Sequence, residues 1–291
     1  MEKGFSMYHP ITNAIYYMAV IGTAIFIMHP VYMAISFLSA AAYEVYLNKG
    51  KGLRKVCGLI PVFLLMALIN PLFSHRGITL IFYFPTGNPL TLESILFGLG
   101  SGLMIVTVIL WFSTFNAIMT SDRILCICSR VFPALGMVVS MVLRFVPMYA
   151  NQSKKISQAN EMLGVKYTGR WRKIKQGMHN FGIMITWSLE NAVITADSMR
   201  ARGYASGKRT DFTIYKFEIR DVLFIVVTII LTAIQVILFF KGIVGYSYYP
   251  MFKIKGVENI GAYVCYGILC LMPVIISVKE DVVWRRLKSK I

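Results

Sequence analysis

The sequence predicts an all-α membrane protein that crosses the bilayer about six times, with long amphipathic helices inserted before the last two spans. Of its 291 residues, 57% are hydrophobic, and they gather in blocks instead of being dispersed as in soluble domains. The blocks have the length of about 20 residues that a spanning helix needs. A basic stretch with helical periodicity separates the fourth block from the fifth. Three regions follow, at residues 1–120, 121–220 and 221–291.

The predicted spans share a mostly apolar composition and little charge. The second is the weakest, because Glu44 lies near its end. The first two are joined only by His29 and Pro30, which predicts a tight hairpin on the outer side. The six blocks are residues 11–28, 31–47, 56–73, 92–115, 222–240 and 261–278.

The distribution of charge predicts the orientation of the chain in a bacterial-type plasma membrane. The net charge is +17. With both termini in the cytoplasm, 26 of the 30 lysines and arginines fall in cytoplasmic segments, as expected when basic loops stay inside. Topology therefore accounts for the basic charge, and we expect the lipid bilayer, not nucleic acid, as the surrounding partner.

Motifs for catalysis or metal binding are missing from the sequence. The five cysteines are scattered, and no histidine stands at metal-ligand spacing from them. Residues 203–210 look like a phosphate-binding loop, but three residues instead of four separate the glycines, and Arg209 stands where Ser or Thr should bind Mg²⁺. We therefore expect a non-catalytic protein without a cofactor or metal ion of its own.

The central region has the periodicity of two amphipathic helices. Apolar side chains recur every three or four residues from 131 to 146 and again from 174 to 189. Pro133 should begin the first helix and Pro147 should bend it, while Gly203 should end the second just after Arg202. The apolar stripes either pack on the chain's own spanning helices or bind a partner.

Several short stretches, in this order, resemble the transmembrane T component of energy-coupling factor (ECF) transporters. Together they run from about residue 92 to residue 221. The flanking segments resemble the family only in being hydrophobic spans. The stretches are LESILFGL at 92–99, WFSTFN at 111–116, TSDR at 120–123, SMVLRFVP at 140–147, KISQA at 155–159 and MRARGY at 199–204.

This resemblance implies a coupling subunit that works with other chains. In the family, two cytoplasmic coupling helices each end in an Ala-Arg-Gly motif that docks on a pair of ATP-binding-cassette (ABC) ATPases. Those ATPases bind ATP and Mg²⁺, and a small membrane S component captures a vitamin or a transition metal. By resemblance, the docking residues are Ala201, Arg202 and Gly203 with Met162, Leu163 and Gly164, and the residues supporting the coupling helices are Arg144, Pro147, Gln158 and Arg200.

The first docking motif departs from the family pattern. Leu163 occupies the arginine position, although Gly164 is retained. We hypothesise an asymmetric coupler with one ionic and one hydrophobic end, suited to two non-identical ATPases. Lysines at 154, 155 and 166 would assist the hydrophobic end.

Two other functional classes stay open at this point. A membrane-anchored scaffold whose basic helices bind anionic lipids would explain the lysines but not the Arg-Gly helix end. An intramembrane enzyme would need polar catalytic residues inside the spans, and these are scarce. Gly98 and Gly102 are spaced either for the approach of another helix or for internal packing. Glu93, in the first turn of the fourth span after an expected cap at Thr91, is expected to be structural.

Overall fold

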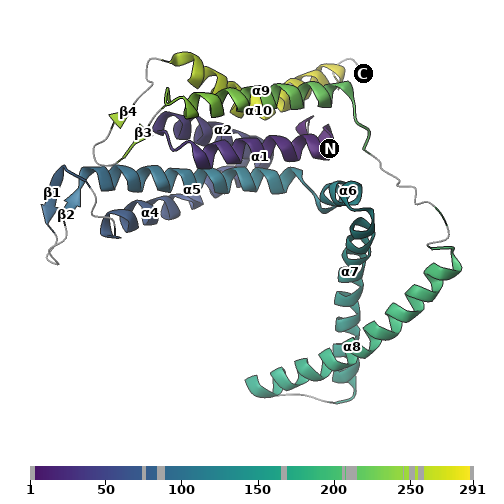
Figure 1. Ribbon diagram of the computed structural model, residues 1–291. Coiled ribbons are helices and arrows are strands. Elements are labelled where there is room, and N and C mark those ends of the chain that lie inside the picture. Colours follow the sequence, from purple (N-terminus) through teal and green to yellow (C-terminus); the bar gives the residue numbers. More distant parts are fainter. Residues whose placement is uncertain are drawn as a thin grey trace. The chain divides into compact units, whose positions relative to one another are not determined.

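The computed structural model describes residues 4–73, 77–83, 89–164, 169–204, 207, 215–244, 246–248, 253–254 and 259–288. Within the chain, two compact units form (Figure 1). The first comprises Met1–Arg123 and Tyr215–Ile291, and the second comprises Ile124–Ile214. Lys166 and Arg209, which were named above as candidate residues, lie outside the described residues.

The first unit is a bundle of apolar helices, which confirms the predicted all-α membrane fold. In the described part of the chain, α2, α3 with α4, α5, α9 and α10 are long and apolar enough to cross a bilayer, while α1, with 17 residues, is shorter. The bounds are η1 Gly4–Met7, α1 Pro10–Phe26, α2 Pro30–Asn48, α3 Gly50–Gly58, α4 Ile60–Phe73, α5 Leu92–Ile118, α9 Ile219–Phe240 and α10 Ile260–Lys288.

The first two helices begin with the same His-Pro pair. His9 Nδ1 accepts a hydrogen bond from the Ile11 amide at 3.2 Å, and His29 Nδ1 accepts one from the Val31 amide at 3.3 Å. The proline after each histidine is the first helical residue, where its fixed φ angle suits the helix and its missing N–H costs nothing. Because His29 caps α2, α1 must end before it, and the first span is shorter than predicted.

Acidification should weaken the cap of α2. Burial lowers the pKa of His29 below its ordinary value of 6.5, so below about pH 6.5 the unfolded chain binds the proton more readily than the folded one. The contribution of neutral His29 to the free energy of unfolding is therefore complete above about pH 6.5 and is lost as the pH falls. We expect His29→Asn, which can still cap the helix, to reduce the fall in melting temperature between pH 7.5 and 5.5. An equal fall in both proteins in detergent would contradict this.

The core of the first unit is aromatic. Phe5 of η1 is fully buried, and its ring contacts those of Tyr16, Tyr17, Tyr43 and Phe224 at centroid distances of 5.4–6.5 Å. These contacts join η1 to α1, α2 and α9. Rings that meet mostly edge to face gain energy beyond their buried area, so the N-terminal turn is an integral part of the bundle.

Some buried polar groups of the bundle are paired across helices. The Tyr32 hydroxyl donates to Gln235 Oε1 at 2.7 Å, and Gln235 Nε2 donates to the Ala262 carbonyl at 3.1 Å. Glu44, the charge that weakened the second predicted span, forms an ion pair with Lys55 at 3.1 Å. A buried carboxylate without a partner would be strongly destabilising. The ion pair therefore allows the charged Glu44 side chain to lie within this span.

The spacing of Gly98 and Gly102 serves internal packing. A Cβ atom on Gly98 would lie 2.9 Å from the Ala67 carbonyl oxygen, and one on Gly102 would lie 3.1 Å from that of Phe63. Both contacts are with α4, which packs along α5. The glycines therefore allow α4 and α5 to approach closely, as the internal alternative predicted.

A short hairpin precedes α5. Strand β1, Leu80–Tyr83, pairs antiparallel with β2, Pro89–Thr91. The Thr79 amide and hydroxyl both donate to Glu93 Oε1, at 3.2 and 2.6 Å, and Thr91 Oγ1 accepts from the Ser94 amide at 3.4 Å. Glu93 thus ties the hairpin to the start of α5, which supports its expected structural role. A second pair joins β3, Tyr246–Ser247, to β4, Lys253–Ile254.

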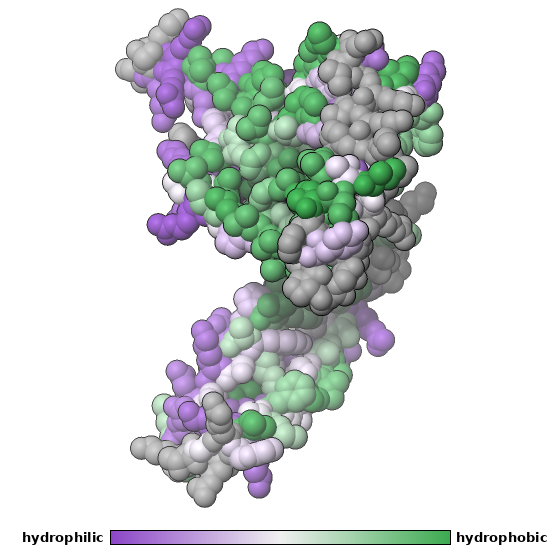
Figure 2. Space-filling view, turned by 90° about the vertical axis from the view of Figure 1, so that its left-hand side faces the viewer, coloured by the Kyte–Doolittle hydropathy of each residue, from purple (hydrophilic) through white to green (hydrophobic). Residues whose placement is uncertain are grey.

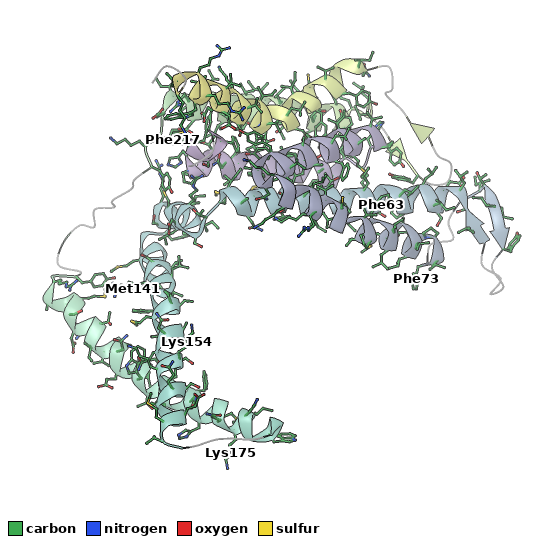
Figure 3. All side chains as sticks on the ribbon, turned by 180° about the vertical axis from the view of Figure 1, so that it is seen from behind. Phe63, Phe73, Met141, Lys154, Lys175 and Phe217 are labelled. Carbon is green, nitrogen blue, oxygen red and sulfur yellow. The ribbon has the colours of Figure 1, made fainter. Side chains whose placement is uncertain are left out.

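The outer surface of the bundle is apolar, as a lipid-facing surface requires. Hydrophobic residues gather over its helices, with hydrophilic residues at the margin (Figure 2). On α4 the exposed side chains include Leu64, Leu68 and Phe73, the last at the end of the helix (Figure 3). An apolar surface of this extent is expected to face lipid or another membrane protein.

The second unit consists mainly of two long helices that contact each other. Helix α7 is Pro133–Met162 and α8 is Arg170–Ala201, preceded by α6, Ser121–Val131. Pro133 begins α7 as predicted, and Pro147 lies inside it. Lys154 and Lys175 mark the two helices in Figure 3. The Tyr149 and Trp187 rings meet edge to face at 5.6 Å, and Asn160 Nδ2 donates to Asn180 Oδ1 at 2.5 Å.

Candidate functional site

Helix α8 ends in a Schellman motif at the predicted docking residues. Arg202 is the last residue near the helical region, and Gly203 turns the chain with φ +78°. The Gly203 amide donates to the Arg200 carbonyl at 2.9 Å, and the Tyr204 amide donates to the Met199 carbonyl at 3.0 Å. This pattern satisfies the last carbonyls and favours glycine at the turning position.

Helix α7 ends with the same backbone geometry. Leu163 has φ −72° and ψ 5°, close to the −82° and 8° of Arg202. Gly164 has φ +79°, and its amide donates to the Glu161 carbonyl at 3.1 Å. Leu163 and Arg202 therefore occupy the same position in two helix ends of the same shape.

The two helix ends present different chemistry at equivalent positions. Met162 is 87% and Leu163 is 77% exposed, so the end of α7 is an apolar tip. Ala201, Arg202 and Gly203 are also exposed, and the arginines at 200 and 202 favourably oppose the negative end of the helix dipole. In the described part of the chain, no hydrogen bond or ion pair engages the Arg202 guanidinium.

The crossing of α7 and α8 separates these ends. Leu163 lies three residues beyond the Asn160–Asn180 contact, whereas Arg202 lies 22 residues beyond it. At about 1.5 Å per residue, the tip of α8 extends roughly 33 Å from that contact. The two helix ends are therefore far apart and do not form one combined site.

Comparison with known proteins decides the family. A family model described as CbiQ, cobalt transport protein, matches residues 8–214. The chain belongs to this family. The matched range contains both helix ends, and the match confirms the resemblance that the short motifs predicted.

Two relatives agree with the CbiQ assignment. One is the energy-coupling factor transporter transmembrane protein EcfT 1 of Listeria monocytogenes serotype 1/2a (strain 08-5578), 33% identical over 107 residues, or 36% of this chain and 40% of the relative. The other is the EcfT protein of Listeria innocua serovar 6a (strain ATCC BAA-680 / CLIP 11262), 29% identical over 216 residues, or 66% of this chain and 80% of the relative. The matched segment thus spans less than half of the first relative and most of the second.

The predicted supporting residues of this CbiQ-family chain lie along the helices, not together. Arg144 and Pro147 are exposed in the middle of α7, and the Arg144 guanidinium lies 5.7 Å from the Phe145 ring. Gln158 is exposed about one turn before the end of α7, and Arg200 is in the last turn of α8. The structure brings only Gln158 and Arg200 near helix ends.

The predicted apolar stripes are exposed on the described helices. On α7 they include Val138, Val142 and Val146, and on α8 they include Met178 and Leu189. Within the second unit these apolar side chains therefore remain uncovered. Among the described residues, no group of three or more His, Cys, Asp or Glu side chains is placed to hold a metal ion.

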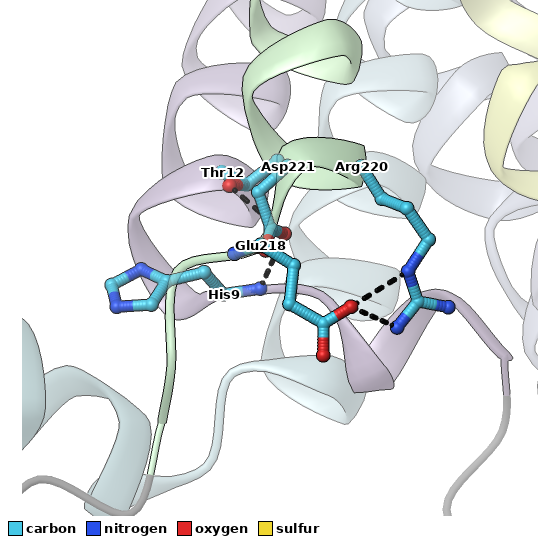
Figure 4. Close-up of polar contacts among 5 residues, drawn as sticks. All are labelled: His9, Thr12, Glu218, Arg220 and Asp221. Carbon is cyan, nitrogen blue, oxygen red and sulfur yellow. Dashed lines mark hydrogen bonds and ion pairs between the residues drawn. The ribbon is translucent and has the colours of Figure 1, made fainter.

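A polar cluster at the start of α9 was missed by the sequence analysis. Asp221, only 4% exposed, accepts hydrogen bonds from the His9 amide at 2.9 Å, the Thr12 hydroxyl at 3.4 Å and the Glu218 amide at 3.0 Å (Figure 4). A local signal was present, because acidic residues three apart before an apolar run resemble a helix-start pattern. The contact with α1 gave no such signal.

Proposed function

We propose that this chain is the transmembrane T component of an ECF-type, ATP-driven uptake transporter. It links two ABC ATPases to a substrate-binding S component that imports a vitamin or a transition metal, and both of its termini are cytoplasmic. ATP and Mg²⁺ bind to the partner ATPases, and this chain is not catalytic. The observation that carries the proposal is the pair of crossed helices with matched, exposed, glycine-terminated ends inside the family match.

Long continuous helices suit the transmission of movement. Helices α7 and α8 contain 30 and 32 residues, which corresponds to about 45–48 Å each. The ring contact between Tyr149 and Trp187 and the Asn160–Asn180 hydrogen bond connect them. When two ATPases hold the separate ends and approach each other on binding ATP, the pair can transmit that movement.

The two ends should dock by different forces. Arg202 presents a planar fork of donors that can pair with a carboxylate or with carbonyl groups. Leu163 and Met162 offer exposed apolar area, whose burial contributes about 25 cal/mol per Å². An ionic end and a hydrophobic end match two grooves of different chemistry, as two non-identical ATPases would provide.

Co-purification from native membranes tests the proposed function. The tagged chain should bring down two ABC ATPases and at least one small membrane protein, identified by mass spectrometry, and that small protein would nominate the substrate. Recovery of anionic lipid without any ATPase would instead favour the lipid-scaffold function.

Restoring arginine at the end of α7 should not improve docking. We expect Leu163→Arg to leave ATPase recovery unchanged or to lower it several-fold, because a charge would enter a groove that accommodates leucine and would lose its hydration. Leu163→Met, which keeps the apolar character, is the matched control. Clearly tighter assembly of the Leu163→Arg protein with its native ATPases would contradict the asymmetric coupler.

A further inference from the structure

The chain leaves and re-enters the first unit at two residues that contact each other. Arg123 is the last residue before the second unit, and Tyr215 is the first residue after it. The Arg123 guanidinium carbon lies 5.8 Å from the centre of the Tyr215 ring. Arg123 is only 3% exposed. A buried guanidinium over an aromatic face is held more strongly than one in water.

The returning segment is also fixed to the start of α1. The Phe217 ring lies 4.9 Å from the His9 ring, and the Glu218 amide donates to Asp221 Oδ2 at 3.0 Å. The other oxygen of the same carboxylate accepts from the His9 amide at 2.9 Å (Figure 4). The four residues from Tyr215 to Glu218 are thus held at both ends before α9 begins.

The segment by which the chain leaves the first unit, residues 118–123, is anchored in a similar way. The Arg123 amide donates to the Thr120 carbonyl at 3.0 Å, and the Met119 amide donates to the Phe115 carbonyl at 2.7 Å. Ile118 and Met119 are both buried. The segment that follows α5 is therefore fixed to the bundle, and its buried residues determine the position of Arg123.

We propose that Arg123 and Tyr215, together with His9, Phe217 and Asp221, form a joint that transmits movement of the second unit to α1 and α9. These five residues are called the junction cluster. The proposal rests on the proposed function, because it names where ATPase-driven movement enters the membrane bundle. The second unit has two covalent connections to the first. Since Arg123 and Tyr215 contact each other, a displacement of either residue reaches the starts of both helices.

The members of the junction cluster are positioning residues. The relevant feature of Tyr215 is the ring face, since the contact is between the ring and a cation. Tyr215→Phe should therefore behave as the wild type, while Tyr215→Leu removes the π face. Arg123→Lys keeps a cation for the ring, and Arg123→Gln does not. These pairs separate loss of the contact from general damage to the fold.

Hydrogen exchange of the complex that co-purifies with the tagged chain tests the joint, with ATP and orthovanadate as the probe. In wild type, nucleotide should change exchange both at the ends of α7 and α8 and in the first turns of α1 and α9. In Arg123→Gln and Tyr215→Leu, the response at the ends of α7 and α8 should persist, while that at α1 and α9 falls about fivefold. Arg123→Lys and Tyr215→Phe should retain the full response.

The outcomes distinguish the joint from the proposed function. An unchanged response at α1 and α9 in Arg123→Gln and Tyr215→Leu overturns the joint while leaving the coupling function intact. Absence of ATPases from the wild-type sample overturns the coupling function, and the transmission role falls with it. Hydrogen exchange of the isolated chain still tests the junction cluster in that case. If the cluster forms, Arg123→Gln should speed the exchange of the amides of residues 215–218.

Discussion

Replacing Arg202 with glutamate should reduce ATPase recovery with the tagged chain by more than tenfold. The proposed groove receives a guanidinium, so reversing the charge removes its charge-assisted hydrogen bonds and places a carboxylate against acceptor groups. Breaking a desolvated pair of this kind costs about 3–5 kcal/mol. Arg202→Ala should show a smaller loss in the same direction. Quantitative mass spectrometry of the pull-down, normalised to the tagged chain, measures both variants.

A charge reversal elsewhere on α8 controls for bulk electrostatics. Lys175 is exposed near the start of the helix, 27 residues or about 40 Å from Arg202. Lys175→Glu changes the net charge by the same amount but should retain the ATPases. Equal loss from Lys175→Glu and Arg202→Glu would show that overall basic charge, as in a lipid-binding scaffold, matters more than the helix end.

The helix ends could be predicted from the sequence because their signals are local. Glycine at the turning position, with its positive φ angle, needs only the preceding residues to complete the hydrogen-bond pattern. The ends at Gly164 and Gly203 follow this rule. The start of α7 at Pro133 follows another local rule, because the fixed φ angle of proline suits the first residue of a helix. The equivalence of Leu163 and Arg202 was also predicted, because the resemblance to the family places Met162, Leu163 and Gly164 where an Ala-Arg-Gly motif is expected.

The contacts that fix the bundle could not be predicted in this way. His9 and Asp221 are 212 positions apart, and no local pattern identifies such partners. Glu44 was recognised as a problem for its span, but its pairing with Lys55 depends on how α3 packs against α2. For Gly98 and Gly102, the choice between internal packing and the approach of another helix also depended on the position of α4. Sequence patterns thus indicated the spans and helix ends, while the fold was needed for the junction.

Asp221→Asn should destabilise the bundle far more than a change at its neighbour Arg220. The carboxylate accepts from His9 and Thr12 on one oxygen and from Glu218 on the other. An asparagine that keeps the first oxygen turns its NH₂ group towards the Glu218 amide, leaving a buried donor without an acceptor. This costs roughly 1–3 kcal/mol, which lowers the melting temperature by about 2–12 °C for a unit of this size.

Arg220 provides the matched control because its ion pair lies on the surface. Its guanidinium meets Glu218 Oε2, but the two side chains are 65% and 56% exposed (Figure 4). Exposed pairs contribute about 0–1 kcal/mol, so Arg220→Gln should leave thermal unfolding in detergent nearly unchanged. A loss from Arg220→Gln that equals the loss from Asp221→Asn would mean that net charge at the start of α9 governs stability. The larger loss from Asp221→Asn would instead locate the stability in the buried contacts between α1 and α9, where the proposed joint requires a rigid support.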